Sequence, residues 1–281
     1  IFTGEDFKMA VINTNVAATL TANALSRNDR AATQAMERLS TGLKINSAAD
    51  DAAGMAMANT MTAQVRGLDM AVKNANDAIA MIQTADGASI EIGDMLQRMR
   101  ELAVQAVNGT VTDADRGQLD LEYQQLITEI GRIGDNTEWN GTNLIDDSAG
   151  SSGTVTYQIG DTAQTMTVDF GDLSDDGDLG LTGDITDSTN AAAAILDVDV
   201  AIVALNTQRA TYGAAINRLE HTVDNLSNVS MNTQAALSRI QDADYAAETT
   251  ELSRTQIVAQ AGTAMLAQAN QQAQSVLALL K

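Results

Sequence analysis

Few residues of this 281-residue chain have types and spacing that could support catalysis. The single histidine, His221, stands between Leu219 and Val223 in a segment with helical periodicity. A zinc protease helix needs two histidines at helical spacing, which one histidine cannot supply. The absence of cysteine excludes disulfides, thiolate metal sites and thiol nucleophiles. We interpret His221 as a solvated helix residue, and we expect no catalytic residue and no cofactor.

The middle of the chain holds the other candidate ligands. Asp172, Asp175, Asp176 and Asp178 supply carboxylates, the ligands that calcium prefers, but they lack the spacing of a calcium loop. A solvated acidic loop is therefore favoured over a metal site. The hydroxyl residues from 148 to 156 are possible sugar acceptors, as in any surface loop. Trp139 precedes an Asn-Gly pair, and we predict that it anchors a tight turn there.

The charge balance restricts the partners. Sixteen basic residues against 37 acidic ones give a net charge of -21, which excludes a nucleic-acid partner because phosphate binding needs a basic face. No unbroken run of 18 apolar residues is present, so we expect no membrane insertion. Residues 1–8, which precede Met9, are interpreted as an extension or a tag.

The chain has no proline, the residue that interrupts helices, so we expect long helices to position any functional site. Helical periodicity predicts helices over 13–43, 52–108 and 113–133, with a connector at 45–51. Coiled-coil spacing is clear in the second helix, whose phase shifts at Asp86 and Gly87; we expect a break or local overwinding there. The positions of the two stripes are Ala58, Met61, Val65, Leu68, Val72, Ala75, Ile79 and Ile82, then Ala85, Ser89, Ile92, Leu96, Met99, Ala103 and Ala106.

The second half of the chain mirrors the first. Two alternating segments, 154–159 and 165–170, predict a β-hairpin, and an acidic loop is expected over 173–189. A helical stripe begins at Ala191 and continues to Ile240. A last stripe, rich in small residues that allow close helix approach, comprises Leu252, Thr255, Ala259, Gly262, Leu266, Ala269, Ala273, Val276 and Leu280.

These elements predict a mainly α fold, in which long antiparallel helices form a coiled-coil-like bundle with a small β-hairpin region in the middle of the chain. The outermost helices are too polar and rich in small residues to fold alone, so they should order on assembly, which predicts a polymer. The expected organisation is an N-terminal helix at 9–50, a helical bundle at 51–143 and 191–241, an acidic and hairpin region at 144–190, and a C-terminal helix at 242–281.

Both ends of the chain resemble bacterial flagellins. The resemblance rests on residues 9–15 (MAVINTN), 37–54 (ERLSTGLKINSAADDAAG), 74–87 (NANDAIAMIQTADG), 96–104 (LQRMRELAV), 139–141 (WNG), 218–239 and 257–279. It covers well over half of the chain, in order, and only the middle departs, being short where many flagellins insert outer domains. The resemblance therefore implies a short flagellin without large outer domains. It also implies that the two terminal helices form an inner core, the bundle an outer core, and the middle a variable region.

The resemblance implies a structural subunit, not an enzyme, whose main partner is itself in a helical homopolymer for motility. Its expected location is the extracellular flagellar filament, reached through the flagellar type III system. The implied further partners are an export chaperone on the C-terminal helices, the filament cap and the hook-associated proteins. We predict polymerisation contacts along the extreme termini, at Val16, Leu20, Leu39, Leu252, Leu266, Val276 and Leu280.

The resemblance also implies recognition by Toll-like receptor 5 of a host. The candidate contacts are Gln97, Arg98, Glu101, Leu102 and Glu122, with Met99 replacing the valine that is more common in flagellins. By pattern alone, Arg98, Arg100 and Glu101 are ordinary surface charges. Two alternatives remain open: a hook-filament junction protein that shares these terminal helices, and a flagellin-like cell-surface binding protein.

Overall fold

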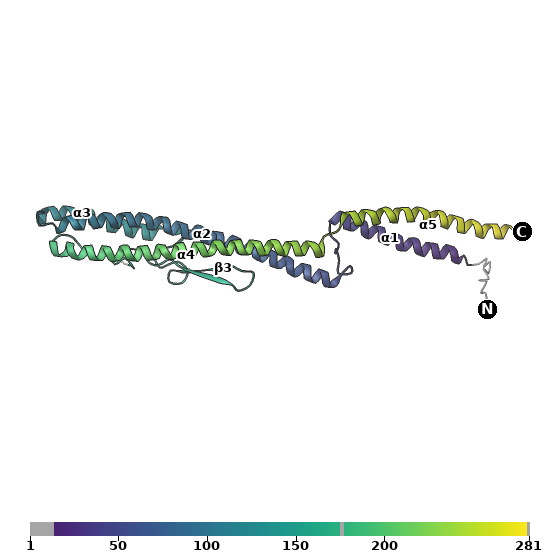
Figure 1. Ribbon diagram of the computed structural model, residues 1–281, viewed down its shortest axis with the longest axis horizontal. Helices are drawn as coiled ribbons and strands as arrows, with labels where there is room; N and C mark the ends of the chain where they lie inside the picture. The colour runs from purple at the N-terminus through teal and green to yellow at the C-terminus, as the bar shows by residue number, and fades with distance from the viewer. Residues whose placement is uncertain (1–13, 175–176, 280–281) are drawn as a thin grey trace. The chain divides into compact units, whose positions relative to one another are not determined.

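The computed structural model describes residues 14–174 and 177–279, with side chains as far as residue 271. Contacts divide the chain into a terminal unit, residues 1–62 with 234–281, and a central unit, residues 63–233. The mainly α fold with a small hairpin in the middle of the chain is confirmed (Figure 1). The elements are α1 (Val16–Thr41), α2 (Ala52–Val107), α3 (Asp113–Asn136), β1 (Glu138–Trp139), β2 (Thr142–Asn143), β3 (Thr154–Gln158), β4 (Thr165–Asp169), α4 (Ser188–Gln241) and α5 (Tyr245–Leu279).

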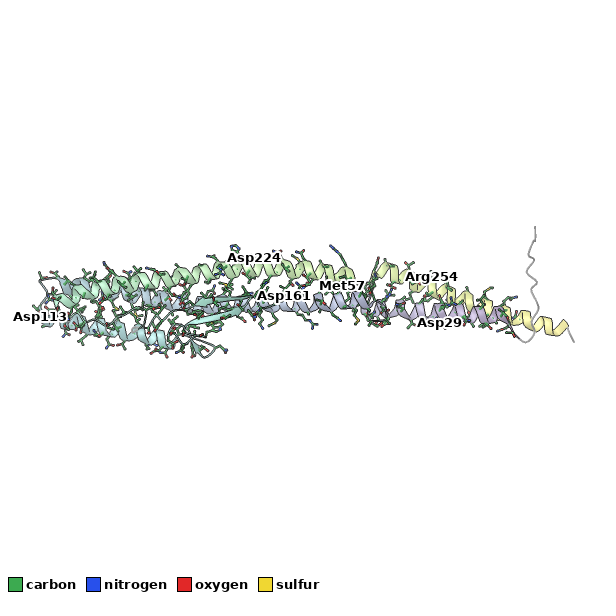
Figure 2. The ribbon with its side chains drawn as sticks, turned by 90° about the horizontal axis from the view of Figure 1, so that it is seen from below. Asp29, Met57, Asp113, Asp161, Asp224 and Arg254 are labelled. Atoms are coloured by element: carbon green, nitrogen blue, oxygen red, sulfur yellow. The ribbon has the colours of Figure 1, made fainter. Side chains whose placement is uncertain are left out.

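In the central unit, α2, α3 and α4 lie side by side around one apolar core (Figures 1 and 2). The second stripe predicted for α2 is confirmed, since all seven of its residues from Ala85 to Ala106 are fully buried. α4 contributes small and large side chains in turn, among them Ala194, Val198 and Leu205. Burial of these faces stabilises the bundle by about 25 cal/mol per Å² of apolar surface removed from water.

Of the break or local overwinding expected at Asp86 and Gly87, the break is wrong, because α2 continues without interruption through both residues. A glycine inside a helix costs only about 1 kcal/mol relative to alanine. Ala85 and Ile92 on either side are fully buried, and Asp86 forms an ion pair of 2.8 Å with Arg209 of α4. Packing of the adjacent turns therefore keeps α2 helical despite the phase shift in its apolar pattern.

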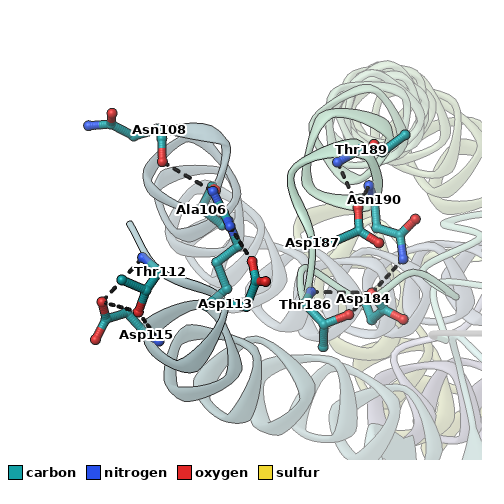
Figure 3. A network of polar contacts seen from close by, with 11 residues as sticks. Ala106, Asn108, Thr112, Asp113, Asp115, Asp184, Thr186, Asp187, Thr189 and Asn190 are labelled. Atoms are coloured by element: carbon teal, nitrogen blue, oxygen red, sulfur yellow. Dashed lines mark hydrogen bonds and ion pairs between the residues drawn. The ribbon is translucent and has the colours of Figure 1, made fainter. Parts of the chain in front are cut away.

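Two sets of polar contacts stabilise the turn between α2 and α3. The Thr112 hydroxyl and the Asp115 carboxylate form a capping box at the start of α3, and the hydrogen bonds from Thr112 lower the pKa of Asp115 (Figure 3). Arg116 is buried, and its guanidinium donates to the carbonyl oxygens of Ala106 and Asn108. Ala106 lies in the last turn of α2 and Asn108 follows its end, where carbonyl oxygens have no partner within the helix.

The predicted hairpin is confirmed as β3 and β4, which pair antiparallel from Thr154 opposite Asp169 to Gln158 opposite Thr165. Alternate residues of β4, Met166 and Val168, point into the core. Phe170 follows β4, and its carbonyl oxygen accepts a hydrogen bond of 2.6 Å from the buried Tyr212 hydroxyl. The two rings lie 5.8 Å apart, so the hairpin is fixed against α4.

An acidic loop is expected after the hairpin. The loop is acidic, but it is also packed against the core. Four of its side chains are buried in the core: Leu173, Leu179, Leu181 and Ile185. The amide of Ile185 donates to Asp120 of α3 at 3.0 Å, and Asp187 accepts from the amides of Thr189 and Asn190 at the start of α4 (Figure 3). Asp175 and Asp176 of the candidate calcium run lie outside the described residues.

The short hairpin of β1 and β2 contains the turn predicted at Asn140 and Gly141, where both residues have positive φ. Trp139, however, remains 37% exposed, so the prediction that it anchors this turn is not supported by burial. The turn is instead specified by its own residues, since asparagine and glycine tolerate the left-handed backbone that a two-residue hairpin loop requires.

Candidate functional site

In the terminal unit, α1 and α5 pack against each other. The predicted stripe of α5 is the face that is shielded: Thr255 is fully buried, and Leu252, Ala259, Gly262, Leu266 and Ala269 are half-buried. A Cβ atom at Gly262 would lie 3.4 Å from Leu25 of α1, which shows how closely the two helices approach. The side chains of Ala273 and Val276, and the whole of Leu280, lie outside the described part of the chain.

The burial of its side chains identifies the packed face of α1. Leu25, Asn28, Ala35 and Leu39 are buried or half-buried. Val16 and Leu20 are 62% and 69% exposed, so they lie outside the packed face of α1. Their place in polymerisation stays a prediction, and their exposure leaves them available to another molecule.

Polar contacts fix the register of this helix pair. The amide of Asn28 donates to the Thr255 carbonyl oxygen at 2.7 Å in a buried position. Arg38 forms a half-buried ion pair of 2.9 Å with Glu248. Because a buried polar group without a partner costs about 1–3 kcal/mol, any slip of one helix along the other is disfavoured. Sequence reasoning missed these residues, although Asn28 follows Leu25 at helical spacing and precedes Ala35 on the same face.

The candidate receptor residues lie in the central unit, where α2 packs beside α3. The Arg98 guanidinium donates to Glu122 at 2.8 Å and to Glu101 at 3.0 Å, and the hydrogen bond to Glu122 is the main cause that raises the pKa of Arg98. These three side chains and Gln97 are exposed. Leu102 is 1% exposed, which corrects its assignment as a surface contact. Its position in the core supports α2 beneath the charged residues.

A shallow groove between α2 and α4 begins beside Gln97. Its volume is about 180 Å³, and it is lined by Ile90, Gly93, Asp94, Gln97, Ile202, Leu205, Asn206 and Arg209. These residues include no pairing of a nucleophile with a base. Within residues 14–174 and 177–279, no three histidine or acidic side chains are placed to hold a metal ion.

α4 is apolar on more than one face. One 18-residue window of this helix has a mean hydropathy of 1.6, long and apolar enough by length and composition to cross a membrane. Length and composition alone do not decide membrane insertion, so the expectation of no insertion stays a prediction. One face of the helix packs into the bundle core, and Leu196, Val200 and Val203 extend the apolar character to the outer face.

Comparison with known proteins places these helices in a family. The sequence profile of the bacterial flagellin N-terminal helical region matches residues 12–150, and that of the C-terminal helical region matches residues 195–280. A flagellin of Halalkalibacterium halodurans is 47% identical over 274 residues, which cover 96% of this chain and 100% of that protein. The chain belongs to the bacterial flagellin family.

Other relatives agree over the same length. The flagellin of Bacillus subtilis is 43% identical, over 96% of this chain and 99% of its own. A protein of Treponema phagedenis named flagellar filament 33 kDa core protein is 41% identical, over 96% and 100%. Flagellins are structural proteins that form the extracellular flagellar filament, so this flagellin is a structural filament subunit.

The two profiles divide this flagellin in a way that agrees with its helices. The N-terminal region includes α1, α2 and α3, and the C-terminal region begins within α4 and includes α5 to its end. The segment between them, residues 151–194, carries the β3–β4 hairpin and the packed loop. In this flagellin, α1 and α5 from opposite ends of the sequence pack together in the terminal unit, and the middle of the chain belongs to the central unit.

Proposed function

We propose that this chain assembles into the filament through the outward faces of α1 and α5. The observation that carries this proposal is the exposure of large apolar side chains on both helices of the terminal unit: Val16, Leu20, Met36, Ile257, Val258 and Met265. A two-helix unit with apolar residues on its outward faces needs further partners to bury them. Other copies of the same helices supply such partners, since head-to-tail contacts that do not close on themselves generate open helical polymers.

Within this proposal, the polymerisation residues have two roles. Val16 and Leu20 contact neighbouring copies, whereas Leu39, Leu252 and Leu266 hold α1 against α5. Val276 and Leu280 lie outside the described side chains, and their place in polymerisation stays a prediction. The function is mechanical and needs no catalytic residue or cofactor.

Truncation gives the first test. A chain that lacks residues 247–281 should not polymerise, while the central unit, which contains none of these residues, should remain folded. Sedimentation after seeding and circular dichroism measure the two properties. Normal filaments from the truncated chain would contradict the assembly proposal.

A point substitution gives a finer test. Leu20→Asp places a charge on the outward face of α1 and should prevent sedimentation of polymer. Asn23→Asp is the matched control, because Asn23 is an exposed polar residue of α1 and the substitution adds the same charge. Equal polymerisation by the two variants would remove Leu20 from the interface.

The partners proposed for delivery follow from family membership. An export chaperone would hold the C-terminal helix before secretion through the flagellar type III apparatus, and the cap and hook-associated proteins would meet the same helices at the filament ends. The exposed apolar residues of α5 are the surface such a chaperone would cover. Co-purification of a chaperone with the full chain, but not with a chain lacking residues 247–281, tests this proposal.

Recognition by Toll-like receptor 5 is a second proposed function, favoured by the exposed cluster of Arg98, Glu101 and Glu122. Arg98→Ala with Glu122→Ala should weaken signalling in a reporter cell. The pair of Arg132 and Glu129 on α3 is a matched control, since it is also an exposed ion pair and lies outside the cluster. Unchanged signalling by the first variant would remove the receptor assignment.

A further inference from the structure

Two asparagine–glycine pairs lie in exposed turns of the central unit. Asn108 and Gly109 stand between α2 and α3, and Asn140 and Gly141 stand between β1 and β2. In such a pair the backbone nitrogen of the glycine can attack the side-chain amide of the asparagine, because glycine has no Cβ atom to obstruct the approach. The dipeptide is the same at both places, so a difference in reactivity between them comes from the fold.

The nitrogen of Gly109 is accessible. Gly109 is exposed, its φ is not in the left-handed region, and a Cβ atom built on it would have no atom within 4 Å. The backbone hydrogen bonds of this turn run from the Asn108 amide to Gln105 and from the Val111 amide to Asn108, so neither of them uses the amide of Gly109. The attacking atom therefore has open space around it.

The side chain of Asn108 is folded toward that nitrogen. The backbone amide of Thr110 donates to Oδ1 of Asn108 at 3.2 Å. Because this hydrogen bond spans Gly109, it bends the side-chain amide back over the peptide that carries the attacking nitrogen. The oxygen takes up negative charge during the attack, and a donor already placed on it stabilises that charge, as in an oxyanion hole.

The peptide between Asn108 and Gly109 is activated by a cation. Its carbonyl oxygen, which belongs to Asn108, accepts a hydrogen bond of 3.3 Å from Nη2 of Arg116 (Figure 3). Loss of the proton from the Gly109 nitrogen leaves negative charge shared between that nitrogen and this oxygen, and a cation beside the oxygen favours the loss. Arg116 is 7% exposed and also donates to Ala106 at 2.7 Å, so the guanidinium is held in place. Asp113 binds a different nitrogen of the guanidinium, which leaves Nη2 for the carbonyl.

The second pair is held in a turn that opposes the same reaction. Asn140 and Gly141 have φ angles of 51° and 78° and form the two-residue loop of a hairpin. The loop is closed by the antiparallel pairing of Trp139 with Thr142. A ring between the Asn140 side chain and the Gly141 nitrogen would twist their peptide out of this loop, so the fold should protect Asn140.

We propose that Asn108 is a self-modification site, at which the folded chain promotes the loss of its own side-chain amide. The Gly109 nitrogen gives up its proton and forms a bond to Cγ of Asn108. The bond between Cγ and Nδ2 then breaks, and Nδ2 takes up a proton and leaves as ammonia. Water opens the resulting succinimide ring at either of its two carbonyl carbons, which yields aspartate or isoaspartate. The net change is the hydrolysis of one amide, and water is the only co-reactant.

The product changes the junction of α2 and α3. Both forms add one negative charge to the turn, and isoaspartate also lengthens the backbone by one methylene group beside the carbonyl oxygen that Arg116 binds. No enzyme takes part, so the converted fraction increases with the time that a molecule has spent folded. This inference is independent of the proposed assembly, because every step takes place within one chain.

The rates at the two pairs in the native and the denatured chain test the proposal. The full-length protein is incubated near neutral pH in guanidinium chloride, or in sodium chloride of the same concentration, and tandem mass spectrometry of tryptic peptides follows both conversions. Cleavage after Arg100 and Arg116 gives peptide 101–116, in which Asn108 is the one asparagine. We expect native Asn108 to convert at least about tenfold faster than native Asn140, which corresponds to about 1.4 kcal/mol in activation free energy.

The comparison with the denatured chain is decisive. Asn108 should convert faster in the native chain than in the denatured chain, whereas Asn140 should convert more slowly in the native chain. A native rate at Asn108 that does not exceed its denatured rate would overturn the proposal, because the fold would then give no acceleration.

Variants identify the groups that act. Gly109→Ala should slow the conversion at least about fivefold, because its methyl group obstructs the attack. Gly117→Ala is the matched control, since a Cβ atom there also has no atom within 4 Å and the asparagine–glycine pair stays intact. Arg116→Met should reduce the native rate at Asn108 to about the denatured rate and leave Asn140 as slow as in the wild type, which shows that the central unit remains folded. An unchanged native rate at Asn108 in this variant would contradict the role given to the guanidinium.

Discussion

Removal of one hydroxyl group at Tyr212 should measure how firmly the hairpin is fixed to α4. The side chain is fully buried, and its hydroxyl donates to the carbonyl oxygen of Phe170 at 2.6 Å. Tyr212→Phe keeps the ring contact and leaves that buried carbonyl without this donor. We expect a loss of about 1–2 kcal/mol in the free energy of unfolding. In a unit of this size, such a loss lowers the midpoint of thermal unfolding by about 2–8 °C.

The same group predicts an alkaline effect with a defined sign. Burial raises the pKa of Tyr212 above its ordinary value of 10.0. A group with a higher pKa in the folded state contributes stability that is present below the unfolded pKa and is lost as the pH rises above it. The wild type should therefore lose stability above about pH 10, and Tyr212→Phe should lose less.

Urea titrations at pH 7 and pH 11 measure both effects. Tyr245→Phe is the matched control, because it removes the same atom from an exposed tyrosine of α5 and should change the free energy by less than about 0.5 kcal/mol. Equal stability of Tyr212→Phe and the wild type at both pH values would refute the reasoning about the Phe170 contact.

Three further outcomes follow from the central unit. Ile92→Ala should lower the free energy of unfolding by about 2–5 kcal/mol, because Ile92 is fully buried. Ile90→Ala, at an exposed position two residues away, should lower it by less than about 1 kcal/mol, and chemical denaturation measures the difference. Thr112→Val should destabilise the start of α3 by about 1 kcal/mol, seen as faster amide exchange there than in the wild type. Hydrogen bonds from Thr112 and Asn190 lower the pKa values of Asp115 and Asp184, so stability should be constant from about pH 5 to about pH 7 and fall as the pH drops below about 4; a flat acid titration would contradict this assignment.

The sequence predicts long helices well where one face is uniformly apolar. The seven residues of the stripe from Ala85 to Ala106 are fully buried, and the described residues of the small-residue stripe of α5 are buried or half-buried. In both cases a repeat of three and four residues leaves one face that can be shielded from water. Start signals are equally readable, as Thr112 and Asp115 show at α3.

Prediction failed where apolar residues occupy two faces or where packing opposes a local signal. On α1, the predicted polymerisation residues are divided between two faces, because Leu39 is half-buried together with Leu25 and Asn28, whereas Val16 and Leu20 are exposed. Similarly, the phase shift at Gly87 predicted a break that the packing of adjacent turns overrides.

The acidic composition of the middle segment concealed its core residues. Leu173, Leu179, Leu181 and Ile185 are spaced irregularly among aspartates and glycines, so no period marks them as buried. Leu102 illustrates a related failure at the candidate receptor site. A sequence motif gives the order of its residues, whereas the structure decides which of them reach the surface.

Electron microscopy of the purified full-length chain, seeded with short filament fragments near neutral pH, tests the central claim most directly. The account predicts long helical filaments that elongate from the seeds and consume the monomer. Monomers that stay soluble beside unextended seeds would contradict the claim that this chain is a self-assembling filament subunit.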